Sequence, residues 1–391
     1  MKRFQISFLF CVLLIVSACQ ARPSTSQDIL ALVNGRLIDG TGTPPIENAV
    51  VLIQADRIIE VGVAGEVTIP DRASLLDLQG GTILPGFINA HVHGAYDLER
   101  LAAWAQAGVT GVRDMHTSQI PPNYALRDQA NQDSRYARLV TVGNFITAPG
   151  GYPIQPWGGK ADEVEGASEA REAVLKMLEG GADLIKVAVE SGQDFGQVIP
   201  SLSNEEIAAI VATAHAEGTR VSAHVLVTKD LQRAVTGGVD DIAHMVTDGL
   251  PADLVQQIVD LGIYWEPTLE LWKNVGYGRD KLAIANLAKF FAAGGKVAMG
   301  TDFAGYDKPF QLGMPMLELE MMAQAGMSPM DIIVAATRNA AVVCNLEKEL
   351  GTVEAGKIAD LLVVRADPLQ DLHALADAAW VIHNGEIIRK P

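Results

Sequence analysis

Short apolar runs separated by turn residues characterise the first part of the chain. Residues 30–33, 49–54 and 57–61 are rich in residues that favour strands, and glycine, asparagine and aspartate residues stand between these runs. Strands of this length joined by such turns form sheets with a buried face. We therefore expect residues 28–84 to form a small β-sandwich, or half of one.

The pattern changes after residue 93, where strand-like apolar runs begin to alternate with helical stretches. This alternation predicts βα units around a parallel sheet. A capping box at 203–206 and a proline at 329, directly after Ser328, mark the starts of two helices. Eight such units predict an α/β fold, a TIM (β/α)8 barrel over residues 85–348. The expected strands are residues 83–94, 108–115, 138–146, 183–189, 220–226, 240–245, 263–267 and 296–303.

The strand-and-turn pattern returns in the last part of the chain. Residues 359–364 predict one strand, and residues 380–388 predict two strands joined at Asn384-Gly385. A tail of this length, 349–391, is short for an independent domain. We expect it to complete the N-terminal sandwich, so that the barrel is inserted between the two halves of a composite β-sandwich.

The first residues have the layout of a secretory signal. Lys2 and Arg3 precede an apolar run, and the run ends in small residues before Cys19. The end of the run resembles a bacterial lipobox, which predicts a lipoprotein signal peptide over 1–18, a lipid on Cys19 and a tether over 19–27. An ordinary signal peptide is the alternative. The expected location is the bacterial cell envelope, in the periplasm and anchored through Cys19.

Charge and cysteine content limit the partners. The chain has 391 residues and a formal net charge of −17, so we expect no nucleic acid partner and membrane contact only through the lipid. Of the three cysteines, Cys11 lies in the signal and Cys19 would be lipidated, which leaves Cys344 without a partner and predicts no disulfide framework. The oligomeric state stays open, and the expected partner is a small-molecule substrate.

Residues of metal-ligand type fall at the ends of five predicted strands. A single strand-end histidine is usually structural, a lone lysine can extend to solvent, and an aspartate can cap a helix. Together they indicate a site, because side chains at the C-terminal strand ends of a TIM barrel converge over its mouth. The residues are His91, His93, Lys186, His224, His244 and Asp302.

The sequence resembles the amidohydrolase superfamily, in particular its imidazolonepropionase-like and prolidase-like branch. The resemblance covers nearly everything after Asp28. The motifs that carry it are 84–93 (LPGFINAHVH), 111–114 (GVRD), 181–186 (GADLIK), 300–302 (GTD), 337–341 (TRNAA) and 351–361 (GTVEAGKIADL).

The resemblance implies a TIM barrel with a composite β-sandwich and a site with two divalent ions, zinc being the first expectation. One ion would be held by His91, His93 and Asp302, and the other by His224 and His244. Lys186, carboxylated by carbon dioxide, would bridge them as an anionic ligand. A hydroxide bridging the metals would attack the substrate, and Asp302 would serve as general base and acid.

The expected reaction is hydrolysis of an amide-type C–N bond, in a dipeptide, an N-acyl amino acid or a cyclic amide. A mononuclear hydrolase or deaminase is one alternative, but the glutamate that deaminases usually carry three residues after the fifth-strand histidine is missing after His224. A catalytically silent binding lipoprotein is another. The fold alone does not choose the substrate.

Substrate contacts are expected from the loops that follow the strands. His116 follows the second strand, and the loop 147–159 carries Tyr152 and Trp157. Residues 264–268 could add another wall. We assign the remaining histidines to structure or surface: His215, His373 and His383.

Overall fold

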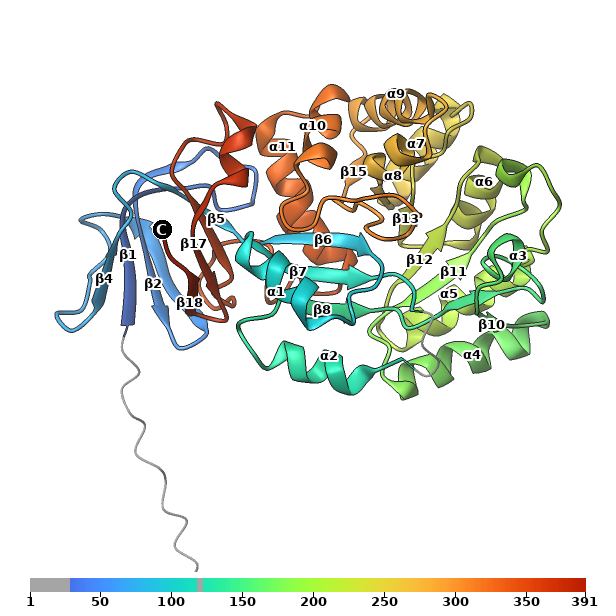
Figure 1. Cartoon of the computed structure of the whole chain (residues 1–391), viewed down its shortest axis with the longest axis horizontal. Coiled ribbons are helices and arrows are strands. Elements are labelled where there is room, and N and C mark those ends of the chain that lie inside the picture. The colour runs from blue at the N-terminus through green and yellow to red at the C-terminus, as the bar shows by residue number, and fades with distance from the viewer. Residues whose placement is uncertain (1–28, 118–121) are drawn as a thin grey trace, which may run out of the picture.

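The computed structural model describes residues 29–117 and 122–391. The predicted signal peptide, the tether and Cys19 lie outside these ranges, so the lipid anchor stays a prediction. Figure 1 shows two parts: strands from both ends of the chain gather at one end of the molecule, and a barrel surrounded by helices forms the other. Within the described ranges, no helix combines the length and the apolar character needed to cross a membrane.

The first part is a mixed sheet to which both chain ends contribute, and this confirms the predicted composite. In the described residues it has eight strands in the order β18-β17-β16-β5-β1-β2-β3, with β4 paired to β1. The antiparallel pair β16 and β5 joins the C-terminal half to the N-terminal half. The strands are β1 (Ile29–Leu37), β2 (Ile46–Gln54), β3 (Arg57–Val63), β4 (Ser74–Asp77), β5 (Thr82–Pro85), β16 (Leu361–Val364), β17 (Ala378–His383) and β18 (Glu386–Arg389).

The apolar stretch expected as one strand over 83–94 is divided between the two parts. β5 (Thr82–Pro85) belongs to the mixed sheet and β6 (Phe87–Val92) opens the barrel. Gly86 lies at the junction, where an added Cβ would come within 2.7 Å of Thr110 Cγ2 and 2.9 Å of Thr110 Cβ. A glycine is therefore required where the chain passes from one sheet to the other.

The second part is the predicted TIM barrel. Its parallel strands form one group, β6-β7-β8, and a second, β10-β9-β11-β12-β13-β14-β15. Backbone hydrogen bonds join the groups on both sides, from Ala90 N to Met299 O at 2.9 Å and from Asp183 N to Thr141 O at 2.9 Å. The strands are β6 (Phe87–Val92), β7 (Val109–Asp114), β8 (Arg138–Thr141), β9 (Phe145–Thr147), β10 (Asp162–Glu163), β11 (Ile185–Ala188), β12 (Val221–His224), β13 (Asp241–Ala243), β14 (Tyr264–Glu266) and β15 (Lys296–Val297).

The third predicted strand, 138–146, is divided into β8 and β9. Gly143, with φ 72°, lies between them. A positive φ is favourable mainly for glycine and does not occur within a regular strand, so the extended hydrogen-bond ladder stops there.

Helices cover the outside of the barrel, and two of them start where the sequence predicted. The capping boxes at Ser203 and Ser328 are both formed. The last predicted helix contains a π-helical turn, Ala335–Asn339, between two α-helical segments. The α-helices are α1 (Leu98–Gln106), α2 (Tyr124–Asn131), α3 (Ile154–Trp157), α4 (Gly166–Gly180), α5 (Asn204–Ala216), α6 (Thr228–Gly237), α7 (Ala252–Leu261), α8 (Leu269–Val275), α9 (Arg279–Ala292), α10 (Met316–Gln324), α11 (Pro329–Val334) and α12 (Ala340–Val343).

Candidate metal centre

The barrel brings the predicted ligand residues to one end of its strands. His91 lies in β6, Lys186 in β11 and His224 at the end of β12. The parallel register places His224 beside Ala188 and Ala243, so the strand ends of β11, β12 and β13 lie at one level. Five of the six residues are buried, and the His93 side chain is 18 % exposed. The strands therefore gather these side chains at the C-terminal face, where TIM barrels carry their active sites.

His91, His93 and Asp302 form the first group. Asp302 Oδ1 lies 3.1 Å from His91 Nε2 and 3.0 Å from His93 Nε2. Ligand-type atoms of the three residues all lie within 4.8 Å of one another. Two imidazole nitrogens and a carboxylate oxygen so arranged are donors that suit zinc and similar divalent ions. The three residues are a candidate metal site.

His224 and His244 form the second group, beside the first. His224 Nδ1 lies 3.1 Å from His244 Nε2. The rings of His91 and His244 are 4.8 Å apart between centroids, which places the two groups in direct contact. A second metal position at His224 and His244 stays a prediction from the resemblance.

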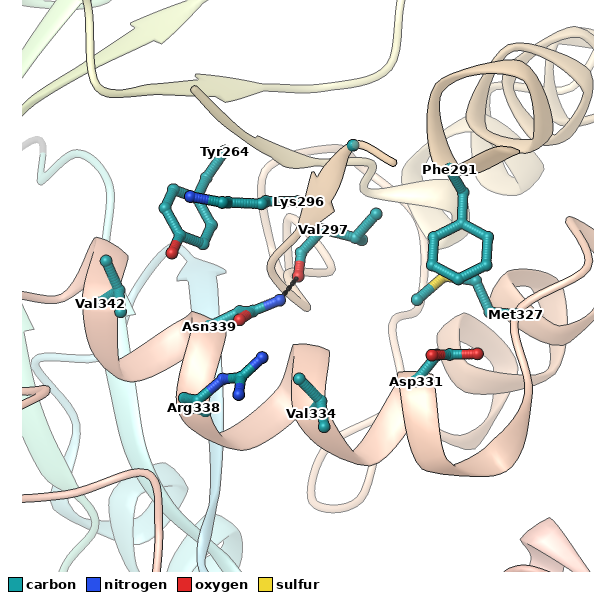
Figure 2. A pocket seen from close by; sticks show the side chains of 11 residues that line it. Tyr264, Phe291, Lys296, Val297, Met327, Asp331, Val334, Arg338, Asn339 and Val342 are labelled. Atoms are coloured by element: carbon teal, nitrogen blue, oxygen red, sulfur yellow. Dashed lines mark hydrogen bonds between the residues drawn. The ribbon is translucent and has the colours of Figure 1, made fainter. Parts of the chain in front are cut away.

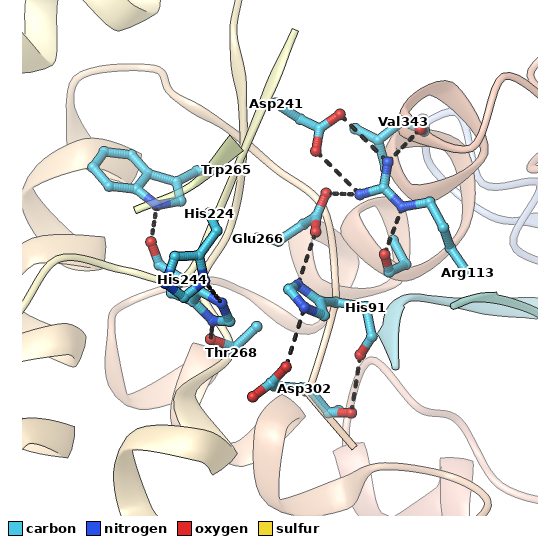
Figure 3. A network of polar contacts seen from close by, with 12 residues as sticks. His91, Arg113, His224, Asp241, His244, Trp265, Glu266, Thr268, Asp302 and Val343 are labelled. Atoms are coloured by element: carbon cyan, nitrogen blue, oxygen red, sulfur yellow. Dashed lines mark hydrogen bonds and ion pairs between the residues drawn. The ribbon is translucent and has the colours of Figure 1, made fainter. Parts of the chain in front are cut away.

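Each of these histidines has a polar neighbour at its other ring nitrogen, although His91 Nδ1 and His224 Nε2 form no hydrogen bond within the described residues. His93 Nδ1 lies 3.2 Å from the carbonyl oxygen of His116, and His244 Nδ1 lies 3.0 Å from Thr268 Oγ1. His91 Nδ1 lies 3.3 Å from Glu266 Oε2, which Figure 3 shows on the side of the ring opposite Asp302. His224 Nε2 has a looser neighbour, Glu190 Oε2, at 4.0 Å. Partners of this kind fix the ring orientation of metal-binding histidines and leave the inner nitrogen free to coordinate.

Lys186 interacts electrostatically with histidines of both groups, and its charge lowers the pKa of His91 and of His224. Its side chain is fully buried, and its Nζ has no hydrogen-bond partner within the described residues. Burial lowers the pKa of Lys186 from 10.5 to about 7, although the charges of Glu266, Asp241 and Asp302 favour the ammonium form. An uncharged amine is therefore accessible near neutral pH.

The electrostatics of the first group favour a carboxylate at Asp302 beside a neutral ring at His91, whereas at His93 burial lowers the pKa but the nearby Asp302 turns the shift upward. Burial disfavours the charged form of Asp302, but the His91 and His93 rings that approach its Oδ1 hold its pKa well below the usual range. Burial lowers the pKa of His91 to about 3. Because a metal binds the carboxylate and the neutral imidazole, both residues are in the required protonation states at neutral pH.

Aromatic residues surround the second group. The ring of Tyr152 stacks on His224 with centroids 4.1 Å apart, and His116 lies 5.0 Å from the ring of Phe145. Trp157 lies farther out: it contacts Phe195 and is 61 % exposed. Tyr152 and His116 thus lie beside the candidate metal ligands, whereas Trp157 lies at the rim. The substrate contacts expected of these three residues stay predictions.

The histidines assigned to structure or surface lie away from both groups. His215 pairs with Asp240, the exposed His373 pairs with Asp371, and His383 contacts the Ser134 carbonyl oxygen. A hollow of about 450 Å³ adjoins the starting residues of β14 and β15, Tyr264 and Lys296 (Figure 2). It is therefore at the opposite end of these strands from the candidate metal centre.

The sequence did not predict the residues that lie at the outer ring nitrogens of the histidines, on the side away from the candidate metal centre. Residues 264–268 were named only as a segment that could add a wall for the substrate, which stays a prediction. In the structure Glu266 and Thr268 lie beside His91 and His244. Glu190, beside His224, was not selected at all. The available signal was a carboxylate at the end of an apolar strand, because burying an unpaired charge is costly and implies a specific partner.

Comparison with known proteins agrees with this geometry. Ochratoxinase from Aspergillus niger is 25 % identical over 421 aligned positions, which cover 91 % of this chain and 86 % of that protein. The structure of a Xaa-Pro dipeptidase with methionine bound in its active site has a TM-score of 0.79 and 25 % identity, and the match covers 92 % of this chain and 99 % of that one. A prolidase solved with N-methylphosphonate-L-proline has a TM-score of 0.77 and 25 % identity, covering 93 % and 100 %.

The family model gives the assignment, and it confirms the resemblance found in the sequence. The model of the amidohydrolase family matches residues 82–385, which include all six ligand-type residues and the whole barrel. The chain belongs to the amidohydrolase family.

Proposed function

We propose that this protein hydrolyses an amide-type C–N bond in a small molecule and that it does so with two divalent metal ions. The observation that carries the proposal is the adjacent pair of groups, His91, His93 and Asp302 in one and His224 and His244 in the other, together with the fully buried Lys186, whose charge acts on His91 and His224. The likeness to prolidases and to ochratoxinase supports a substrate with an amide bond. Zinc is the first ion to test, because it suits ligands of these types.

In this proposal the histidines hold the metal ions and Asp302 transfers the proton. Bound divalent ions would acidify a water molecule and polarise the scissile carbonyl group. The four histidines would hold the ions, and burial keeps three of them, His91, His224 and His244, neutral by lowering their pKa values. Asp302, kept ionised by its low pKa, would accept the proton of the attacking water and deliver it to the leaving nitrogen.

Lys186 is proposed to complete the ligand set as a carbamate. The lone pair of its uncharged Nζ would form an N–C bond with carbon dioxide and the nitrogen would release a proton, which gives an anionic carbamate with oxygen ligands. The buried Nζ without a partner in the described part of the chain supports this, because a carbamate between two ions would satisfy it.

The walls of the site favour a substrate with an apolar or aromatic part next to the amide. Tyr152 and Phe145 lie against His224, and Phe195 continues the aromatic wall from Tyr152. Dipeptides, N-acyl amino acids and cyclic amides are the classes to test. The aromatic rings support side-chain recognition and do not select one of these classes.

The first experiment measures metal content and turnover on a panel of these substrates. We expect about two ions per chain after incubation with zinc and bicarbonate, and hydrolysis that stops with a chelator. Asp302→Asn should lower kcat by at least about 10²-fold, because the amide cannot carry the proton. Undiminished turnover by Asp302→Asn would show that another group moves the proton.

A single-metal site is the second candidate, because the three residues His91, His93 and Asp302 already form a candidate site by themselves. Lys186→Ala separates the two. The two-ion proposal predicts that this variant binds one ion instead of two and loses most of its activity. Retained activity with one ion in both proteins would favour the single-metal site.

We also propose that the protein is exported and held in the cell envelope through a lipid on Cys19. The support is the sequence of residues 1–19 alone. Incorporation of labelled fatty acid into the expressed protein, and its loss in Cys19→Ser, would test the anchor. Labelling that persists in Cys19→Ser would rule out this attachment site.

A further inference from the structure

Glu266 connects a candidate metal ligand to a buried cation below the barrel mouth. It is the last residue of β14 and is fully buried. Its Oε2 lies 3.3 Å from His91 Nδ1, and its Oε1 accepts a hydrogen bond from Arg113. Figure 3 shows Glu266 between the ring of His91 and the guanidinium group of Arg113. The two carboxylate oxygens thus have separate partners.

Arg113 is held on every side and cannot turn away from Glu266. Its Nε donates to the Ala90 carbonyl oxygen at 2.7 Å, and its Nη1 donates to the Val343 carbonyl oxygen at 2.6 Å. Its Nη2 donates to Asp241 Oδ1 at 3.1 Å and to Glu266. A guanidinium group only donates hydrogen bonds, so the atom of residue 266 that faces it must be an acceptor.

We infer that Glu266 is a positioning residue for the first metal position, an inference that rests on the proposed function. With Oε1 committed to Arg113, Oε2 faces His91 Nδ1 at 3.3 Å, and neither atom has another hydrogen-bond partner in the described part of the chain. A carboxylate oxygen at that place favours the tautomer of His91 with its proton on Nδ1. The lone pair of His91 then lies on Nε2, which faces Asp302 3.1 Å away. Arg113 and Glu266 together fix both the tautomer and the direction of the ring, and a metal can bind only the unprotonated nitrogen.

Within the described residues, the second group has no carboxylate that is itself paired with a buried arginine. The role of Glu266 is therefore specific to the first group. Glu190 lies 4.0 Å from His224 Nε2, and its other oxygen accepts only the backbone N–H of Gly192, at 2.6 Å. Among the described residues, no cation forms an ion pair with Glu190 in the way that Arg113 pairs with Glu266. Loss of Glu266 should therefore weaken one of the two metal positions and not both equally.

Glu266→Gln tests this with almost no change in volume. Because Arg113 requires an acceptor, the amide oxygen must face Arg113 and the amide NH2 must face His91 Nδ1. A donor at that place favours the tautomer of His91 with its proton on Nε2, which cannot coordinate. The expected result is a 10- to 100-fold loss of zinc affinity at one of two positions, measured by competition with a chromophoric chelator.

A second readout uses cobalt in place of zinc. The visible spectrum of the Co²⁺-loaded protein reports the ligands directly, and we expect one of two bound ions to change its bands in Glu266→Gln. The matched control is Glu270→Gln, since Glu270 is 2 % exposed and accepts one backbone N–H, from Gln311 at 2.7 Å. It has no contact with a histidine in the described structure, so its zinc affinity and cobalt spectrum should equal those of the wild type.

Each outcome decides one question. A wild-type protein that binds no zinc overturns the proposed function itself. A wild-type protein that binds zinc, with Glu266→Gln binding it equally well, overturns the inference and leaves the proposed function in place. If Glu266→Gln fails to fold, Glu266→Asp keeps the charge beside Arg113 but is too short to contact both partners. Unchanged zinc affinity and cobalt bands in that variant would also overturn the inference.

Discussion

Three residues near the candidate metal centre have a backbone conformation that side chains disfavour. His244, Thr268 and Asp302 have φ values of 70°, 46° and 62°. Each follows a barrel strand closely, after β13, β14 and β15. The left-handed conformation costs about 1–2 kcal/mol per residue other than glycine, and such residues cluster at functional sites. The turn at each strand end directs these side chains over the barrel mouth, where His244 and Asp302 meet the other ligands.

Gly305 gives a test of how closely Asp302 is packed. A Cβ at position 305 would lie 2.5 Å from Asp302 Cγ and closer still to both carboxylate oxygens. Gly305→Ala should therefore push the carboxylate away from His91 and His93. We expect zinc affinity and turnover to fall by at least about 10-fold, because a displacement of about 1 Å can cost 10²-fold in rate.

The control for Gly305→Ala is Gly180→Ala, at the end of α4, where an added Cβ meets nothing within 4 Å. This variant should keep the wild-type affinity and rate. Equal zinc binding by Gly305→Ala and Gly180→Ala would mean that Asp302 can rotate without loss and that its position is less restricted than the structure indicates.

At the scale of elements, a carboxylate from one helix caps another helix beside the centre. Glu318 of α10 is fully buried and accepts the backbone N–H groups of Leu269 at 2.9 Å and Glu270 at 2.7 Å, at the start of α8. These residues follow Thr268, which contacts His244 Nδ1. α10 thus fixes the turn that holds a candidate metal ligand.

Glu318→Ala should loosen this turn. Two buried N–H groups would lose their acceptor, at a cost of about 1–3 kcal/mol for each unsatisfied group. We expect a lower free energy of unfolding in urea and weaker zinc binding at one position, since Thr268 no longer holds His244 firmly. Glu320→Ala is the control on the same helix, because the Glu320 side chain is 40 % exposed and its partner is the exposed His373. Similar losses in both variants would contradict a capping role for Glu318.

The same scale shows which elements a sequence can predict. The capping boxes of α5 and α11 and the hairpin at Asn384-Gly385 follow from residues a few positions apart, and all are present. The boundary between sandwich and barrel was predicted between residues 84 and 85, but the strand 83–94 was expected to be continuous. The break at Gly86 was missed because an apolar run has the same pattern whether it belongs to one sheet or to two. The break depends on Thr110 in the neighbouring strand, which contacts position 86 only in the folded chain.

At the scale of the whole molecule, the rhythm of βα units and the family motifs predicted the barrel and the ligand-type residues at its mouth. The residues that hold those ligands were not predictable in this way. Glu266 of β14 and Arg113 of β7 are ordinary strand residues until the barrel closes and brings their side chains together beside His91 of β6. The role of such a carboxylate depends on neighbours that are distant in sequence. Only the folded structure therefore distinguishes a residue that orients a candidate metal ligand from one that lines the substrate site.

Burial of the histidine cluster also makes the free energy of unfolding of the whole chain depend on pH. In the metal-free protein, burial lowers the pKa of His244 well below 6.5. The unfolded chain therefore binds a proton at this position below about pH 6.5 that the folded protein does not bind, so acid favours unfolding. One such proton changes the free energy of unfolding by about 1.4 kcal/mol per pH unit.

Buried carboxyl groups change the free energy of unfolding with pH in the opposite direction to His244. The prediction therefore compares the wild type with a variant that lacks this histidine. Burial raises the pKa of Glu318 to about 8 and that of Glu270 to about 7, and acidification from these values toward pH 4.5 favours the folded state. Glu318 and Glu270 contribute in the same way to the wild type and to His244→Gln. The two proteins differ only in the histidine at position 244. As pH falls from 6.5 to 5, the variant should gain stability relative to the wild type by up to about 1.4 kcal/mol per pH unit.

Urea unfolding of chelator-treated protein at several pH values measures this difference in the free energy of unfolding between His244→Gln and the wild type. His373→Gln serves as the control for loss of an imidazole, since the His373 side chain is 69 % exposed. Saturating zinc should widen the dependence on pH in the wild type, because the ions bind only neutral imidazole and each proton on a ligand competes with them. Stability curves of wild type and His244→Gln that stay parallel from pH 7 to pH 5 would show that the folded protein also protonates this histidine, and that the cluster is open enough to hold the charge.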